Sequence, residues 1–263
     1  MRATDLKEAA ELLYDNLRLK TFPVAVKFLE SKADLPDKAR QPSVALGHRV
    51  AICQGVTMAR NYGWTVGLAR EDVVCVPAAI VFGFSDAEDP TASLSELFCQ
   101  IDFSSTRALA EKETATMARF EKGAIEAIVL SPLVKADSTP DTVLLYGNAA
   151  QIARLGQVFS YMTGERPSGE FGGKVDCGEY LIAPFMTQAP RVVIPGNGER
   201  VFAGTQDDEL AFAFPAKFLE DLPDALRASG KAMGVRYPVT PYQNYQPVFP
   251  KAHREMGKKL GVL

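Results

Sequence analysis

The spacing of apolar residues divides the chain into helical and extended segments. Apolar side chains recur every three or four residues through residues 4–19, which predicts an amphipathic helix behind the cap candidate Thr4. The stretch 23-PVAVKFLE-30 alternates apolar and polar residues and is rich in β-branched residues, as is typical of a strand. We further expect strands in 64–69, 126–133, 142–148 and 209–215, and helices in 50–60, 149–163 and 216–229.

Turn and cap signals place the ends of several of these elements. Asn148 is the expected cap of the helix 149–163. The segment 191-RVVIPGNGERVFAGT-205 predicts a hairpin that turns at Gly196-Asn197-Gly198. The proline-rich segment 237–251 is expected to lie over a surface without regular structure.

These elements indicate an α/β fold of mixed α and β structure, in which a sheet is flanked by helices. We expect one globular domain over 1–263. A strand, a cysteine at a helix start and a second strand occur once in each half, which leaves open two similar halves, 1–123 and 124–263.

Composition excludes several classes of protein. The chain has 263 residues, of which 47% are hydrophobic and 23% charged, and a net charge of −3 with no basic cluster. Nucleic acid and anionic membranes both require a basic patch, so neither is expected as a partner. The N-terminal segment lacks the apolar core of a signal peptide, which predicts a cytoplasmic protein whose four cysteines are reduced.

Three of the four cysteines share a sequence context. Cys53, Cys75 and Cys177 each stand near the beginning of an apolar helical segment. In 71-EDVVCVPAAIVFGF-84, Pro77 fits the first turn of a helix and leaves Cys75 at its N-terminus. A helix N-terminus lowers the pKa of a thiol, so these residues could supply three thiolates to one metal centre. Taken singly, each cysteine also fits a small buried hydrophobic residue.

The spacing of the cysteines bears on the kind of metal. Structural zinc sites are typically built from C-x₂-C pairs, which this chain lacks, and only two histidines, His48 and His253, are present. Widely separated single cysteines suit an iron–sulfur cluster better. Cys99 lies within a predicted helix on an apolar face, and core packing is the interpretation we favour for it. The alternative is that Cys99 or a carboxylate is a fourth ligand; with Cys99 the site would be closed by four thiolates.

Several stretches distributed over most of the chain carry a family likeness: 23-PVAVKFLE-30, 53-CQ-54, 75-CVPAA-79, 143-VLLYGNAAQ-151, Cys177 and 203-AGTQDDELAFAFP-215. In these stretches the chain resembles the DUF169 family, a family of aromatic- and cysteine-rich proteins of unknown function. The resemblance implies cysteines at Cys53, Cys75 and Cys177 but no activity. This chain departs from the family pattern at Val76-Pro77-Ala78, where Pro-Gly-Ala is usual, and at Ala149, where proline is usual.

Three hypotheses for the function follow. In the first, Cys53, Cys75 and Cys177 hold a [4Fe–4S] cluster whose fourth position is open for a small-molecule substrate. Such a cluster would act as a Lewis acid in hydration or elimination, with Asp207 or Asp208 as the catalytic base. In the second, the cluster serves a non-enzymatic redox-sensing or electron-transfer module. In the third, the cysteines are inert core and a ligand pocket lies elsewhere. Formation of a homo-oligomer stays open.

Overall fold

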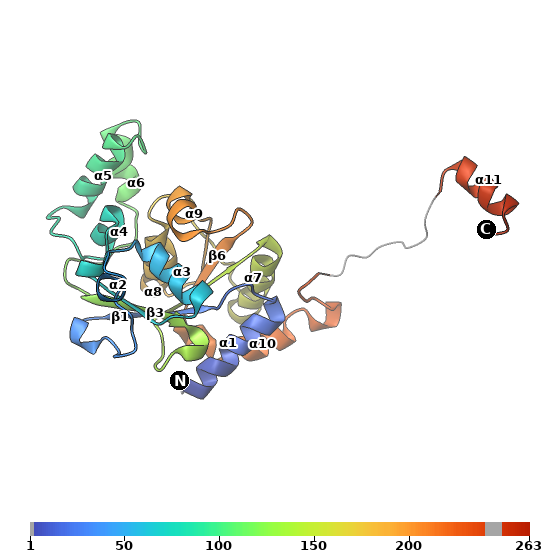
Figure 1. The fold of residues 1–263 in the computed structure, drawn as a ribbon, viewed down its shortest axis with the longest axis horizontal. Coiled ribbons are helices and arrows are strands. Elements are labelled where there is room, and N and C mark those ends of the chain that lie inside the picture. The colour runs from blue at the N-terminus through green and yellow to red at the C-terminus, as the bar shows by residue number, and fades with distance from the viewer. Residues whose placement is uncertain (1–2, 240–248) are drawn as a thin grey trace.

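A six-stranded sheet in the order β2-β3-β1-β4-β6-β5 forms the centre of the computed structural model, which describes residues 3–239 and 249–263 (Figure 1). Every neighbouring pair of strands is antiparallel. The strands are β1 Val24–Leu29, β2 Val66–Ala69, β3 Ala127–Pro132, β4 Thr142–Gly147, β5 Arg191–Val193 and β6 Leu210–Pro215. With the helices around it, this sheet confirms the predicted mixed α/β fold.

Helices occupy much of the remaining described chain. The α-helices are α1 Ala3–Leu17, α2 Pro42–Ala45, α3 Ile52–Tyr62, α4 Val76–Val81, α5 Pro90–Gln100, α6 Arg107–Thr114, α7 Ala149–Thr163, α8 Ala183–Thr187, α9 Asn197–Ala203, α10 Leu222–Ala228 and α11 Lys251–Lys259. Within the described ranges, no helix has the length and apolar character needed to cross a membrane.

The two faces of the sheet bury separate hydrophobic clusters. Val24, Val26 and Phe28 of β1 belong to the cluster that also contains residues of α3 and α4. Ala25, between them in sequence, belongs to the cluster formed with α1, α7 and α10. This alternation follows from the two-residue period of a strand.

Strands from both halves of the chain interleave in the sheet. β1 and β2 come from residues 1–123, and the other four strands come from residues 124–263. β1 lies between β3 and β4 and pairs with both. The two halves therefore share one sheet, in which β4, β6 and β5 of the second half are neighbours.

Several predicted boundaries are confirmed and others are wrong. The helix α7 and its cap Asn148 are confirmed. Thr4 lies inside α1 and does not precede it. The predicted helix over 216–229 is divided, because Pro223 stands in the first turn of a separate helix, α10.

The hairpin predicted over 191–205 is also wrong. The backbone N–H of Arg200 donates to the carbonyl of Gly196 (3.2 Å), so the chain continues from the glycines into helix α9. Most of the irregular segment predicted over 237–251 lies outside the described residues.

The cap of α7 allows a test of this local structure. The side chain of Asn148 accepts hydrogen bonds from the backbone N–H groups of Ala150 and Gln151, both at 3.0 Å. Asn148→Ala should lower the free energy of unfolding by about 1 kcal/mol in urea denaturation, because two donors lose their partner. Asn148→Asp keeps the acceptor and should stay close to wild type. Equal destabilisation by both changes would contradict the capping role.

Candidate functional site

A short backbone bridge brings the first two helix-start cysteines together. Cys53 is the second residue of α3, and Cys75 caps α4. The N–H of Val50 donates to the carbonyl of Asp72 (2.8 Å), and the N–H of Val74 donates to the carbonyl of Val50 (3.0 Å). The residues that precede the two helices therefore run side by side.

The buried carboxylate of Asp72 holds this bridge in place. Its two oxygens accept hydrogen bonds from the N–H and hydroxyl of Ser43 (3.0 and 2.6 Å) and from the N–H of Ala69 (3.0 Å). Three donors satisfy the charge in a site without solvent exposure. The bridge is thereby tied to α2 and β2.

The third cysteine lies at the start of an unusual helix. Cys177 directly precedes a π-helical turn, Gly178–Ile182, which continues into α8. Such turns are rare in proteins, and those that occur are often found at functional sites. Val175, two residues before Cys177, has a φ of 54°, an outlying conformation for a β-branched residue.

Close contacts at two glycines fix the position of this segment. A Cβ on Gly178 would lie 3.2 Å from the carbonyl oxygen of Ala118 and 3.7 Å from the Val81 side chain, so the segment also packs against α4, the helix that Cys75 caps. A Cβ on Gly196 would lie only 2.2 Å from the carbonyl oxygen of Gly173, so only glycine fits where these strands of backbone meet. The side chain of Asp176 accepts a hydrogen bond from the N–H of Gly196 (2.8 Å) and joins the segment to α9.

A buried carboxylate on α9 is the centre of this region. Glu199 is only 4% exposed. The hydroxyl of Tyr146 in β4 donates to it at 3.1 Å, and the hydroxyl of Tyr180 in the π-helical turn donates to its other oxygen. Burial raises the pKa of Glu199 from its ordinary value of 4.5 to about 7, so the carboxyl exchanges a proton near neutral pH.

A buried ion pair borders the tyrosines. Both terminal nitrogens of Arg60 bind the carboxylate of Glu209 (2.9 and 3.1 Å). The guanidinium lies 3.9 Å from the centroid of the Tyr146 ring, a distance typical of a cation–π contact. The positive charge of Arg60 acts against burial in setting the pKa of Glu199.

The three thiols are protonated in this environment, which corrects the expectation of low thiol pKa values. Burial raises the pKa of Cys53 to about 12, and the charges of Glu199 and Cys75 add to the increase. Burial also raises the pKa of Cys75 and raises that of Cys177 well above its ordinary value. The backbone N–H of Ala78 in the first turn of α4 does lower the pKa of Cys75, but burial is the larger effect.

The same electrostatic effects indicate that the three thiols lie near one another. Negative charge on Cys75 or Cys53 would raise the pKa of Cys177, and so would the charges of Glu199 and Asp176. Cys177 belongs to the core cluster against which Cys75 packs. In residues 3–239 and 249–263, however, no three or more histidine, cysteine, aspartate or glutamate side chains are already arranged to hold a metal ion.

The remaining predicted site residues lie elsewhere. Asp207 and Asp208 are on the surface, where Asp207 pairs with Arg200 (3.0 Å) and Asp208 with Lys20 (3.5 Å). Cys99 is in the last turn of α5, partly buried against the core. The structure therefore does not bring Asp207 and Asp208 to the other cysteines and Glu199. Cys99 packs against the same core cluster as Cys75, but it is not among the groups that shift the pKa of Cys53 or Cys177.

Sequence reasoning missed the functional groups of the buried network. Glu199 falls in the segment predicted to be a hairpin turn, where a charged residue is expected in water. The sequence pattern did not reveal that a helix, α9, begins at Asn197. The first turn of this helix directs the side chain of Glu199 into the core. Tyr146 and Tyr180 lie in apolar segments in which a buried hydroxyl requires a partner, and that requirement was visible in the sequence.

Comparison with known proteins identifies the family. Residues 12–224 match the uncharacterised ArCR family DUF169, so the chain belongs to this family and the resemblance inferred from its motifs is confirmed. The chain is similar to the uncharacterized protein MJ0308 of Methanocaldococcus jannaschii, with 26% identity over 228 residues, which cover 86% of this chain and 95% of that protein. No solved structure matches the chain.

The contact between Gly173 and Gly196 predicts a sharp difference between two glycines of α9. Gly196→Ala should destabilise the protein by roughly 1–3 kcal/mol, because the new methyl group overlaps backbone atoms that cannot turn away. Gly198→Ala is the matched control: its Cβ would meet nothing closer than Phe202 at 4.0 Å. We expect it to be neutral or to stabilise by about 0.5–1 kcal/mol. Urea denaturation measures both, and similar losses would contradict the steric argument.

The raised pKa of Glu199 predicts how stability depends on pH. The folded protein holds this proton more tightly than the unfolded chain, so the stabilisation is full below pH 4.5 and is lost as pH rises through about 7. Glu199→Gln stays neutral and lacks this loss. The free energy of unfolding of the wild type, relative to the variant, should fall by on the order of 3 kcal/mol over that interval.

Chemical denaturation of metal-free protein between these pH values is the measurement. Asp208→Asn, which changes an exposed carboxylate paired with Lys20, is the control and should follow the wild-type curve. Parallel curves for wild type and Glu199→Gln would show that the buried carboxyl does not bind a proton in this range.

Proposed function

We propose that the protein holds an iron–sulfur cluster through Cys53, Cys75 and Cys177. The observation that supports the proposal is the electrostatic coupling of three helix-start cysteines from separate segments. Cys75 acts on the pKa of Cys53, and both act on the pKa of Cys177. The buried carboxylate of Glu199 acts on two of the three, Cys53 and Cys177. The donors are sulfur alone, which favours a thiophilic centre.

Loading the centre requires two changes in the protein. The sulfurs must turn toward one another, because no metal-holding arrangement is present among the described residues. The thiols must also lose their protons, which burial disfavours. Incorporation should therefore release protons and become more favourable as pH rises.

Glu199 is the group best suited to move a proton beside the centre. Its carboxyl changes protonation near neutral pH, and the hydroxyls of Tyr146 and Tyr180 hold it in one orientation. We assign it the role first expected of Asp207 and Asp208, which lie at the surface. When bound through three thiolates, a [4Fe–4S] cluster would supply Lewis acidity at its open position, which suits hydration or elimination of a small oxygenated substrate.

A second function is favoured by the surface next to Cys75. Val74 and Val76 on either side of it are both 57% exposed. One edge of the centre would then lie close to solvent, which suits electron exchange with a partner or sensing of oxidants. Turnover of a substrate separates the two functions, since a sensor or carrier would have none.

The test is the metal content of protein purified without oxygen. We expect visible absorbance, iron and acid-labile sulfide in the wild type, and loss of all three in Cys53→Ser, Cys75→Ser and Cys177→Ser. Cys99→Ser is the control and should keep the cluster. Folded wild-type protein that remains colourless after reconstitution would overturn the proposal, and equal loss on changing Cys99 would replace it with a four-cysteine site.

A further inference from the structure

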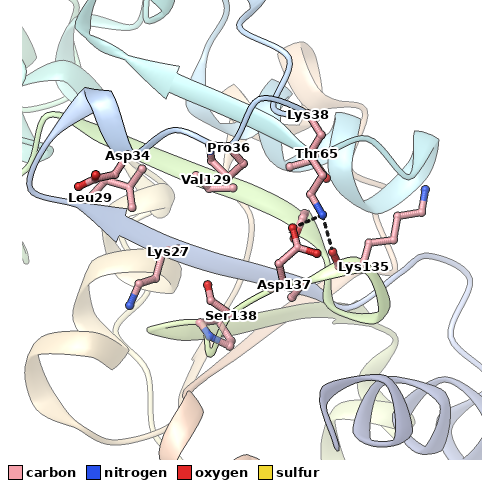
Figure 2. Close-up of a pocket in the computed structure, with 14 residues that line it drawn as sticks. Lys27, Leu29, Asp34, Pro36, Lys38, Thr65, Val129, Lys135, Asp137 and Ser138 are labelled. Carbon is pink, nitrogen blue, oxygen red and sulfur yellow. Dashed lines mark hydrogen bonds and ion pairs between the residues drawn. The ribbon is translucent and has the colours of Figure 1, made fainter. Parts of the chain in front are cut away.

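A cavity of about 130 Å³ lies on the face of the sheet opposite the cysteines (Figure 2). Its floor is formed by alternate residues of β1 and β3, among them Ala25, Val129 and Ser131. The loop around Pro36 and the segment 135–140 form its walls. On this face of the sheet the helices α1, α7 and α10 cover the neighbouring strands β4 and β6, whereas these two loops cover the part of β1 and β3 that lines the cavity.

The wall around Pro36 is firmly attached to the sheet. The N–H of Arg40 donates to the carbonyl of Thr65 (2.9 Å), and the N–H of Gly67 donates to the carbonyl of Arg40 (3.1 Å). A Cβ on Gly67 would lie 2.7 Å from the Leu35 side chain, so the glycine makes room for this loop to approach β2. The cavity therefore has a fixed outline, as ligand pockets commonly do.

Two hydroxyl groups of largely buried residues line the cavity. Thr65 is 9% exposed and Ser131 is 5% exposed. Among the described residues neither hydroxyl has a hydrogen bond to protein, and neither oxygen is one of the fully enclosed atoms, so both are accessible from the cavity. Their hydrogen-bonding capacity is thus directed at whatever occupies the space.

Two ammonium groups reach the same cavity. Lys27 in β1 pairs with Asp141 (2.9 Å). Figure 2 shows that Lys38 binds Asp137 and the carbonyl of Lys135 (3.1 Å). An ammonium has three N–H donors, so both lysines keep at least one for a ligand. The ammonium of Lys135 itself points away and binds the carbonyl of Gly63 (2.7 Å).

We propose that this cavity binds a small organic carboxylate through the ammonium groups of Lys27 and Lys38 and the hydroxyls of Thr65 and Ser131. The hydroxyls of Thr65 and Ser131 belong to buried residues, whereas Lys38 and the carboxylates of the lining, Asp34 and Asp137, are exposed. The apolar floor suits a short carbon chain better than a phosphate. The cavity volume of about 130 Å³ suits a small ligand.

The experiment is titration of the protein with lactate, followed by NMR chemical shifts, with lactamide as a neutral molecule of the same shape and inorganic phosphate as a second anion. Lactate should cause saturable shifts that lactamide and phosphate do not. Thr65→Val removes a hydroxyl at constant shape, and Lys27→Met removes a charge while keeping the apolar stem. Each should weaken lactate binding about tenfold, as the loss of one such interaction implies.

Lys20→Met is the matched control, because Lys20 also pairs with a carboxylate but lies outside the cavity. It should bind lactate like the wild type. The absence of saturable shifts, equal responses to lactate and lactamide, tighter binding of phosphate, or unchanged binding in both Thr65→Val and Lys27→Met would overturn the proposal. None of these readouts uses a metal centre, so the outcome is independent of the iron–sulfur proposal.

Discussion

The register of β1 is the constraint on which the rest of the molecule depends. This strand is hydrogen-bonded on both sides, to β3 along Val24–Leu29 and to β4 along Val24–Val26. Its even-numbered residues face the cysteine side, and Ala25 and Lys27 face the small cavity. A slip of one residue would send Lys27 into the larger core and withdraw three apolar side chains from it. The register of β1 therefore determines which side chains face each of the two candidate sites.

The cysteine site illustrates a competition between two local effects. A helix N-terminus favours a thiolate, whereas removal from water favours the neutral thiol. In this fold the second effect is larger at Cys53, Cys75 and Cys177, and the neighbouring carboxylate Glu199 adds to it. Helix position alone is therefore a weak guide to thiol reactivity when the helix starts inside a core. The positive charge of Arg60, which acts on Glu199, is already paired with Glu209.

The sequence predicts the elements of this fold better than it predicts the neighbours of each residue. Periodic segments such as β1 and α7 were recognisable because local patterning and burial agree. The segment after β5 was misread because Gly196 is required by its contact with Gly173, 23 residues earlier in the sequence, and not by a hairpin turn. The helix-start context of the cysteines could also be inferred locally. Glu199, Tyr146 and Tyr180 meet only through the fold, and no spacing rule connects them.

The π-helical turn after Cys177 sets a requirement on chain length. An α-helix advances about 100° per residue, and a π-helical turn contains one residue more than an α-helical turn. The helix that runs from Asp176 through Thr187 therefore has a phase offset between its two ends. Loss of one residue from Gly178–Ile182 would rotate Cys177 away from Glu199 or lift α8 from the core. The fold therefore constrains the number of residues between Cys177 and Pro184. An insertion or deletion there would be harder to accommodate than most substitutions.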